Sequence, residues 1–105
     1  MTALTATRRV TIANEEGMHL RPSYLVSKLA LKYDAEVFLE KDGQAYEASS
    51  VLNLMMLGAA QGTEIVLRAS GRQAEEAVDA LAALIENGFR DGPETAPGGS
   101  APSEL

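Results

Sequence analysis

Apolar and polar residues alternate in several segments of the first ninety residues. In the first of these, Val10 and Ile12 alternate with polar neighbours, which is the period of a half-buried strand. Asp42 and Gly43 predict a two-residue hairpin between two later strands, because both central positions of a type I′ turn need a positive φ. The predicted strands cover residues 7–13, 35–41, 44–48 and 64–70.

Three other segments carry apolar residues at the spacing of a helix face. The first segment, residues 24–33, follows Pro22, whose fixed φ suits the first turn of a helix. The second segment is short and nearly all apolar. It has Ser49 or Ser50 as its N-cap and ends at Gly58, where glycine can take the left-handed conformation that follows a helix.

The third helix is predicted to begin after Ser70 and Gln73, which are spaced as in a capping box, and to end at Gly88. The order of elements is therefore strand, helix, strand, strand, helix, strand, helix. This order predicts an α+β open-faced sandwich, with a four-stranded antiparallel sheet and three helices on one face.

Residues 91–105 differ in composition from everything before them. The segment is rich in Pro, Gly and Ser, carries three acidic residues and no basic one, and has no apolar periodicity. It can bury too little apolar surface to offset the entropy of ordering. We expect one domain over residues 1–90 and a disordered acidic tail over 91–105.

Charge and the lack of cysteine exclude several classes of protein. Fifteen acidic against nine basic residues give a net charge of −6, which disfavours nonspecific nucleic-acid binding. Without cysteine there is no disulfide framework and no thiolate metal site. No apolar run approaches the roughly 18–20 residues of a membrane span, and Arg8 and Arg9 interrupt any signal-like stretch. We expect a cytoplasmic monomer with no metal and no cofactor.

Candidate chemistry is concentrated where the first helix begins. The stretch Glu16-Gly17-Met18-His19-Leu20-Arg21-Pro22-Ser23 holds the only histidine, with an arginine two residues later. At a helix start, His19 and Leu20 would lie beside backbone N–H groups that have no partner within the helix. These donors, the helix dipole and Arg21 would form an anion pocket beside a nucleophilic imidazole, which indicates phosphoryl transfer through a phosphohistidine. The alternative is a solvated histidine next to a helix cap.

This stretch resembles the active-site segment of the HPr family, the histidine-containing phosphocarriers of the bacterial phosphotransferase system. Residues 49–58 resemble the second helix of the family, and residues 61–77 resemble its last strand and the start of its last helix. The resemblance covers about residues 5 to 90. It implies the same fold of four antiparallel strands with three helices on one side.

The resemblance also implies a role for each residue of the stretch. Nδ1 of His19 would accept the phosphoryl group and Arg21 would assist, while the free N–H groups near Leu20 and Arg21 would hold phosphoryl oxygens. The chain would then be a carrier rather than an enzyme. It would take a phosphoryl group from phosphoenolpyruvate through enzyme I and pass it to enzyme IIA domains. Leu20 replaces a smaller residue of the family, and Glu15 and Glu16 add negative charge just upstream.

The short second helix has more apolar residues than it can bury. Leu54 and Leu57 are expected in the core. Three of the other apolar residues are expected to form an exposed docking patch for partner proteins, because flexible and aliphatic side chains suit several partners. The predicted docking patch consists of Val51, Leu52 and Met55.

The sequence leaves two questions open: whether a kinase regulates the protein, and whether it serves the sugar or the nitrogen branch of the phosphotransferase system. Ser50 aligns with the serine that a dedicated kinase phosphorylates in many HPr proteins, so a serine kinase is a candidate partner. The alternative is a plain N-cap. Residues 53–56 look somewhat like the nitrogen-branch paralogue of HPr. A second function therefore stays open beside the carrier, namely a regulatory HPr-like module of nitrogen-branch or carbon-control type that acts mainly by phosphorylation-dependent docking.

Overall fold

The computed structural model describes residues 4–90, so the tail predicted over 91–105 lies outside the described residues. The seven elements follow the predicted order. They are β1 (Thr5–Thr11), α1 (Leu20–Ala30), β2 (Glu36–Lys41), β3 (Gln44–Glu47), α2 (Val51–Leu57), β4 (Glu64–Ser70) and α3 (Ala74–Glu86).

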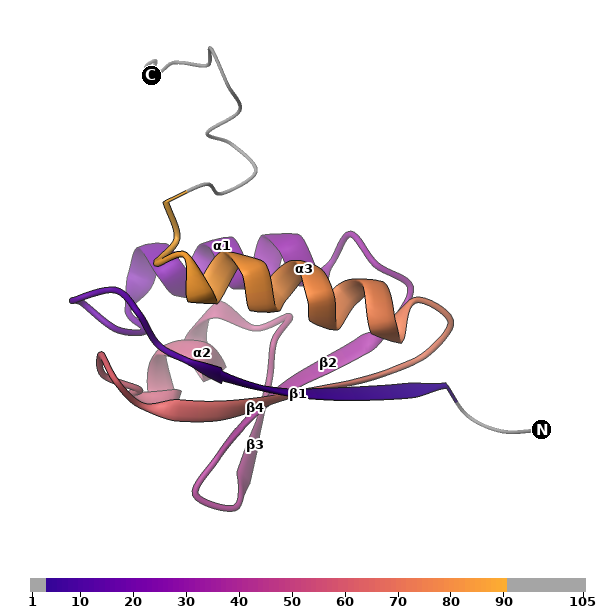
Figure 1. The fold of residues 1–105 in the computed structure, drawn as a ribbon, viewed down its shortest axis with the longest axis horizontal. Coiled ribbons are helices and arrows are strands. Elements are labelled where there is room, and N and C mark those ends of the chain that lie inside the picture. Colours follow the sequence, from indigo (N-terminus) through magenta and orange to yellow (C-terminus); the bar gives the residue numbers. More distant parts are fainter. Residues whose placement is uncertain (1–3, 91–105) are drawn as a thin grey trace, which may run out of the picture.

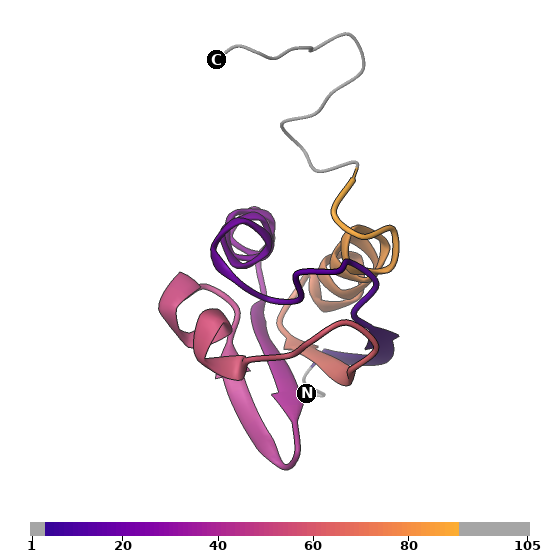
Figure 2. The same cartoon turned by 90° about the vertical axis from the view of Figure 1, so that its left-hand side faces the viewer.

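The four strands form one antiparallel sheet in the order β1-β4-β2-β3. The last strand in sequence, β4, lies inside the sheet, where it pairs with β1 from Thr5↔Ser70 to Thr11↔Glu64 and with β2 from Glu36↔Ser70 to Glu40↔Val66. The helices cover one face of this sheet, with α1 and α3 side by side above it (Figures 1 and 2). The predicted open-faced sandwich is therefore confirmed.

The core lies between the covered face of the sheet and the helices. In β4 the inward side chains alternate strictly with exposed or half-buried ones, as the sequence pattern predicts. The helix α3 buries seven of its thirteen residues, which recur at the spacing of one helix face. Full burial of each large aliphatic side chain stabilises the fold by about 1.5–3 kcal/mol. The buried residues of these two elements are Ile65, Leu67, Ala69, Ala74, Ala77, Val78, Leu81, Ala82, Leu84 and Ile85.

Local turn and cap signals are confirmed at two places. Asp42 has φ 52° and Gly43 has φ 82°, as the hairpin between β2 and β3 requires. Of the two candidate serines, Ser50 is the N-cap of α2, and its hydroxyl accepts a hydrogen bond from the Asn53 N–H at 3.2 Å. Gly58 ends the helix with φ 65°. Each of these features depends on neighbouring residues, which is why the sequence pattern was sufficient.

The capping box predicted at Ser70 and Gln73 is wrong. Gln73 itself occupies the N-cap position of α3 and makes no side-chain cap bond. Its Oε1 instead accepts the Asp34 N–H at 2.8 Å, and its own N–H donates to the Asp34 carbonyl at 2.9 Å. Gly71, with φ 131°, inserts a turn that separates Ser70 from the helix. A contact with a segment distant in sequence thus replaces the local cap.

Candidate functional site

The loop between β1 and α1 has its sharpest constraint at Gly17. Its φ is +70°, and a Cβ at this position would lie 2.3 Å from the Ala59 carbonyl oxygen. The next residue, Met18, is buried and donates its N–H to the same carbonyl at 2.8 Å. The segment that follows α2 therefore holds the loop that leads to His19. A side chain at residue 17 would break this contact.

His19 is the N-cap residue of α1, with φ −120° and ψ −155°, and its side chain is exposed. The carbonyl of His19 accepts the Ser23 N–H at 2.9 Å, but its imidazole makes no cap bond. The N–H groups of Leu20 and Arg21 have no hydrogen-bond acceptor among residues 4–90. Because the first turn also lacks acidic residues, the helix dipole and two free donors stand open to an anion beside the imidazole.

The guanidinium of Arg21 reaches the C-terminal end of α3. Its Nη2 donates to the Phe89 carbonyl at 3.1 Å. Phe89 has a φ of 65°, which is uncommon for a bulky residue, and its side chain is only 1% exposed. Because a carbonyl is neutral, this contact holds the arginine without cancelling its positive charge. A phosphoryl group would offer a charged and therefore stronger acceptor.

The two glutamates upstream of the histidine are exposed, and one of them has a hydrogen-bond partner. The Glu16 carboxylate accepts a bond from Asn14 Nδ2 at 3.4 Å, and this bond is the main cause that lowers the pKa of Glu16. The charges of His19 and Arg21 lower the same pKa further. Glu16 therefore stays ionised near the site, tethered to Asn14 in the loop.

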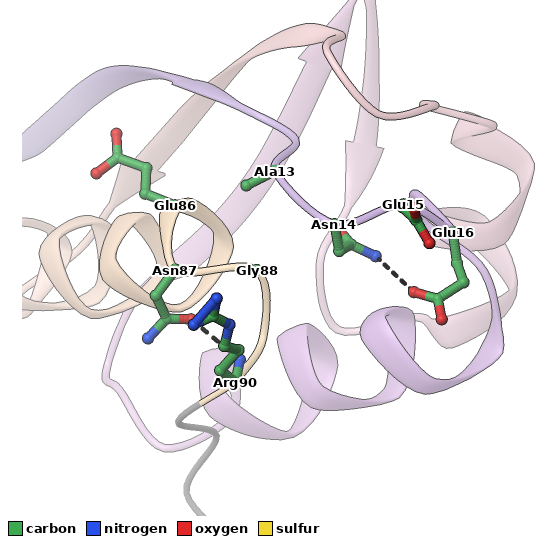
Figure 3. A pocket seen from close by; sticks show the side chains of 8 residues that line it. All are labelled: Ala13, Asn14, Glu15, Glu16, Glu86, Asn87, Gly88 and Arg90. Atoms are coloured by element: carbon green, nitrogen blue, oxygen red, sulfur yellow. Dashed lines mark hydrogen bonds between the residues drawn. The ribbon is translucent and has the colours of Figure 1, made fainter.

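An open polar hollow lies between this loop and the end of α3 (Figure 3). Within the described part of the chain, no group of three or more His, Cys, Asp or Glu side chains could hold a metal ion. The helices of residues 4–90 are also all too short or too polar to cross a membrane. The lining residues are Ala13, Asn14, Glu15, Glu16, Glu86, Asn87, Gly88 and Arg90.

The predicted docking patch is at the surface of α2. Leu52 is 68% exposed and Met55 is 38% exposed, while Val51 is half-buried. The expected core residues Leu54 and Leu57 are buried.

The structure also exposes apolar side chains that the predicted docking patch does not include. They are Met56 on α2 and Leu20 and Tyr24 on α1. The Ser27 hydroxyl of α1 donates a hydrogen bond at 3.0 Å to the carbonyl of Ser49, the residue before the N-cap of α2.

Two further residues of the site were also missed. Asn14 contacts the histidine loop, and the available signal was an Asn three residues before a glycine, which is typical of a side-chain-stabilised turn. Phe89 holds Arg21 through its carbonyl, and the signal was an apolar aromatic residue directly after Gly88, the predicted end of α3, which the structure places at Glu86. The Asn14 contact is local, whereas the contact between Arg21 and Phe89 joins segments 68 residues apart.

Comparison with known proteins places this geometry in a family. A family model described as "PTS HPr component phosphorylation site" matches residues 6–87. The chain is 44% identical over 87 residues to the phosphocarrier protein NPr of Escherichia coli strain K12, covering 82% of this chain and 97% of that protein. It is 38% identical over 85 residues to the phosphocarrier protein HPr of Cupriavidus necator, covering 81% and 96%. The chain belongs to the HPr family of phosphocarrier proteins.

A solved structure of the family agrees in fold. The crystal structure of HPr from Thermoanaerobacter tengcongensis matches with a TM-score of 0.78 and 36% identity, covering 82% of this chain and 97% of that one. The likeness thus extends over nearly the whole length of that relative. The expected membership and the expected fold are both confirmed.

Proposed function

We propose that this chain carries a phosphoryl group on His19, accepts it from enzyme I charged by phosphoenolpyruvate, and passes it to enzyme IIA proteins. The observation that supports this most is the open start of α1, where an exposed imidazole adjoins two backbone N–H groups that have no acceptor within residues 4–90. Family membership supports the same function.

The transfer needs little covalent work from the protein. A neutral ring nitrogen of His19, Nδ1 by resemblance to the family, attacks the phosphorus of the donor. The new N–P bond forms as the bond to the donor's leaving atom breaks. The N–H groups of Leu20 and Arg21 then face the phosphoryl oxygens, and the guanidinium of Arg21 exchanges the neutral Phe89 carbonyl for a charged acceptor. In the second transfer, the N–P bond to His19 breaks as phosphorus bonds to the acceptor atom of enzyme IIA, and the imidazole is released.

We assign the exposed apolar side chains of α2 to partner docking. Leu52 and Met55 lie at the surface of a helix whose C-terminal end leads to Ala59, the residue that binds the histidine loop. Apolar side chains near the reactive group give a transient interface its attraction without a permanent complex. The greater identity to NPr than to the HPr of Cupriavidus necator favours the nitrogen branch over sugar transport.

The regulatory alternative is favoured by one observation, the position of Ser50. Its hydroxyl caps α2 beside the docking patch, so phosphorylation there would place a charge at the helix start and on the interface together. The capping bond to Asn53 already accounts for the serine without a kinase. Incubation with a kinase of this class, read out by an acid-stable phosphoryl group that S50A lacks, separates the two interpretations.

Incubation of the purified chain with phosphoenolpyruvate and enzyme I tests the carrier function. The intact mass should rise by one phosphoryl group, which acid removes and base does not, as expected for a phosphohistidine. His19→Ala should abolish this label with little change in thermal stability, because the side chain is exposed. Ser50→Ala should be labelled like the natural chain. Undiminished labelling of H19A would refute the assignment.

A further inference from the structure

We propose that Asn14 is a positioning residue for phosphoryl transfer, which acts by holding the backbone in front of His19. This inference rests on the proposed carrier function. It concerns a side chain of the open hollow in Figure 3 that does not contact the phosphoryl site itself.

Asn14 forms hydrogen bonds with both the N–H and the carbonyl of Gly17. Its carbonyl accepts the Gly17 N–H at 3.2 Å, and its Nδ2 donates to the Gly17 carbonyl at 3.0 Å. The same Gly17 carbonyl accepts the His19 N–H at 3.2 Å. One carbonyl oxygen therefore connects the amide of Asn14 to the backbone of the residue that carries the imidazole.

The imidazole depends on this backbone for its position. Among residues 4–90 no side chain forms a hydrogen bond with the His19 ring, so its placement follows from the backbone at residues 17 to 19. Gly17 holds a positive φ that few residues adopt, and Asn14 stabilises the turn in that form. A displacement of the loop would move the ring and the free N–H groups of α1 relative to each other.

The chemistry at this position calls for an amide. Nδ2 donates to the Gly17 carbonyl and to the Glu16 carboxylate, and a reversed amide or a carboxylate would set oxygen against oxygen at both. Oδ1 is shielded from solvent and has no partner within the described residues, a cost of burial that an apolar side chain would avoid. The donor function of Nδ2 therefore accounts for the asparagine.

Asn14 also lies next to the second half of the site. A Cβ added to Gly88 would lie 3.9 Å from the Asn14 Cβ, so the asparagine lies beside the turn that follows α3. The next residue of this turn, Phe89, gives its carbonyl to Arg21. Asn14 thus brings the loop that carries the nucleophile close to the turn that holds the arginine.

Kinetics of enzyme I with this chain as the varied substrate test the proposal. Asn14→Ala should lower kcat about tenfold and change KM less than twofold, because misplacement of a reacting group affects the chemical step rather than docking. Asn14→Asp keeps the shape but cannot donate while ionised, and should show the same loss. This second variant decides the matter where N14A folds poorly.

Two variants serve as matched controls. Asn87→Ala removes an asparagine from the same hollow, whose Oδ1 accepts the Arg90 N–H at 3.2 Å, and should transfer like the natural chain. Glu16→Gln removes the charge that Nδ2 also contacts, and its kcat should fall by less than that of N14A. An equal loss in E16Q would assign the effect to Glu16 and overturn the proposal.

Amide hydrogen exchange of the unphosphorylated protein gives a readout that does not need transfer. In N14A the protection of the Met18 and His19 amides should fall about tenfold while that of α3 stays unchanged, as expected of local opening. A uniform fall would mean a merely structural role. Natural kinetics with natural loop protection, or a change in KM alone, would overturn the proposal. Absence of labelling in the natural chain would instead refute the carrier function, and exchange would still decide the role of Asn14.

Discussion

The N-terminal ends of α1 and α2 differ in whether a side chain caps them. Each helix begins with backbone N–H groups that have no partner within the helix. At α2 the Ser50 hydroxyl accepts the Asn53 N–H. At α1 the N-cap residue is His19, whose side chain caps nothing, and the N–H groups of Leu20 and Arg21 stay without acceptors among residues 4–90.

This difference shows how the fold separates stability from chemistry. A serine or asparagine cap stabilises a helix by about 1 kcal/mol, and α1 does without it. In return, an anion can occupy the place where a cap oxygen would lie. What keeps α1 in place is burial of its other face, where Leu25 and Val26 are almost fully enclosed.

The largest loss of stability is expected from Gly17→Ala, which disturbs the loop that leads to the uncapped start of α1. The positive φ costs about 1–3 kcal/mol for alanine, and the clash with the Ala59 carbonyl adds to it, so we expect a loss of roughly 3 kcal/mol in the free energy of unfolding. Gly43→Ala is the matched control, because Gly43 also has a positive φ but nothing lies within 4 Å of its added Cβ. Denaturant unfolding of both variants measures the difference. Equal losses would show that the contact with Ala59 is unimportant.

The second-largest effect is expected from a charged residue placed in the docking patch. Leu52→Glu should raise the KM for the donor enzyme more than tenfold, a loss of about 1.4 kcal/mol or more, because a charge must lose its water on docking. Leu31→Glu is the control. Leu31 is as exposed as Leu52, at 68%, but it lies at the C-terminal end of α1, the end opposite to His19. Thermal unfolding should change little in either. Equal KM values in both variants would place docking elsewhere.

Removing the cap of α2 and adding one to α1 tests the difference between the two helix starts directly. Ser50→Ala should lower the free energy of unfolding by about 1 kcal/mol, or some 4–8 °C in Tm, through loss of the bond to Asn53. His19→Asn should change it in the opposite sense, by up to about 1 kcal/mol, because asparagine can cap α1. Calorimetry of the two variants gives both signs. A loss of stability in H19N would mean that the α1 start is already satisfied.

The smallest effect is expected from the C-terminal segment. Deletion of residues 92–105 should shift Tm by less than about 2 °C, because a Pro/Gly-rich segment without an apolar stripe contributes little packing. The truncated chain keeps Phe89 and its bond to Arg21. A drop of many degrees on thermal unfolding would show that the segment docks on the domain.

Much of the fold was predictable because its signals are local. Alternation marked β4 at its observed bounds, the Asp-Gly pair marked the hairpin, and serine and glycine marked the ends of α2. The start of α1 was predictable from Pro22, which lies in its first turn. The end of α1 was less predictable, because the apolar spacing continues to Tyr33 while the helix ends at Ala30.

The sequence by itself determined the order of elements, the inward faces and the open helix start that carries the only histidine, because each is encoded within a few neighbouring residues. Tertiary structure alone decided the place of β4 between β1 and β2, the bond from Arg21 to Phe89 and the bond from Gln73 to Asp34. These features join residues 39 to 68 positions apart, or whole strands. No local pattern contains them, since they form only when burial of the shared core brings distant segments together.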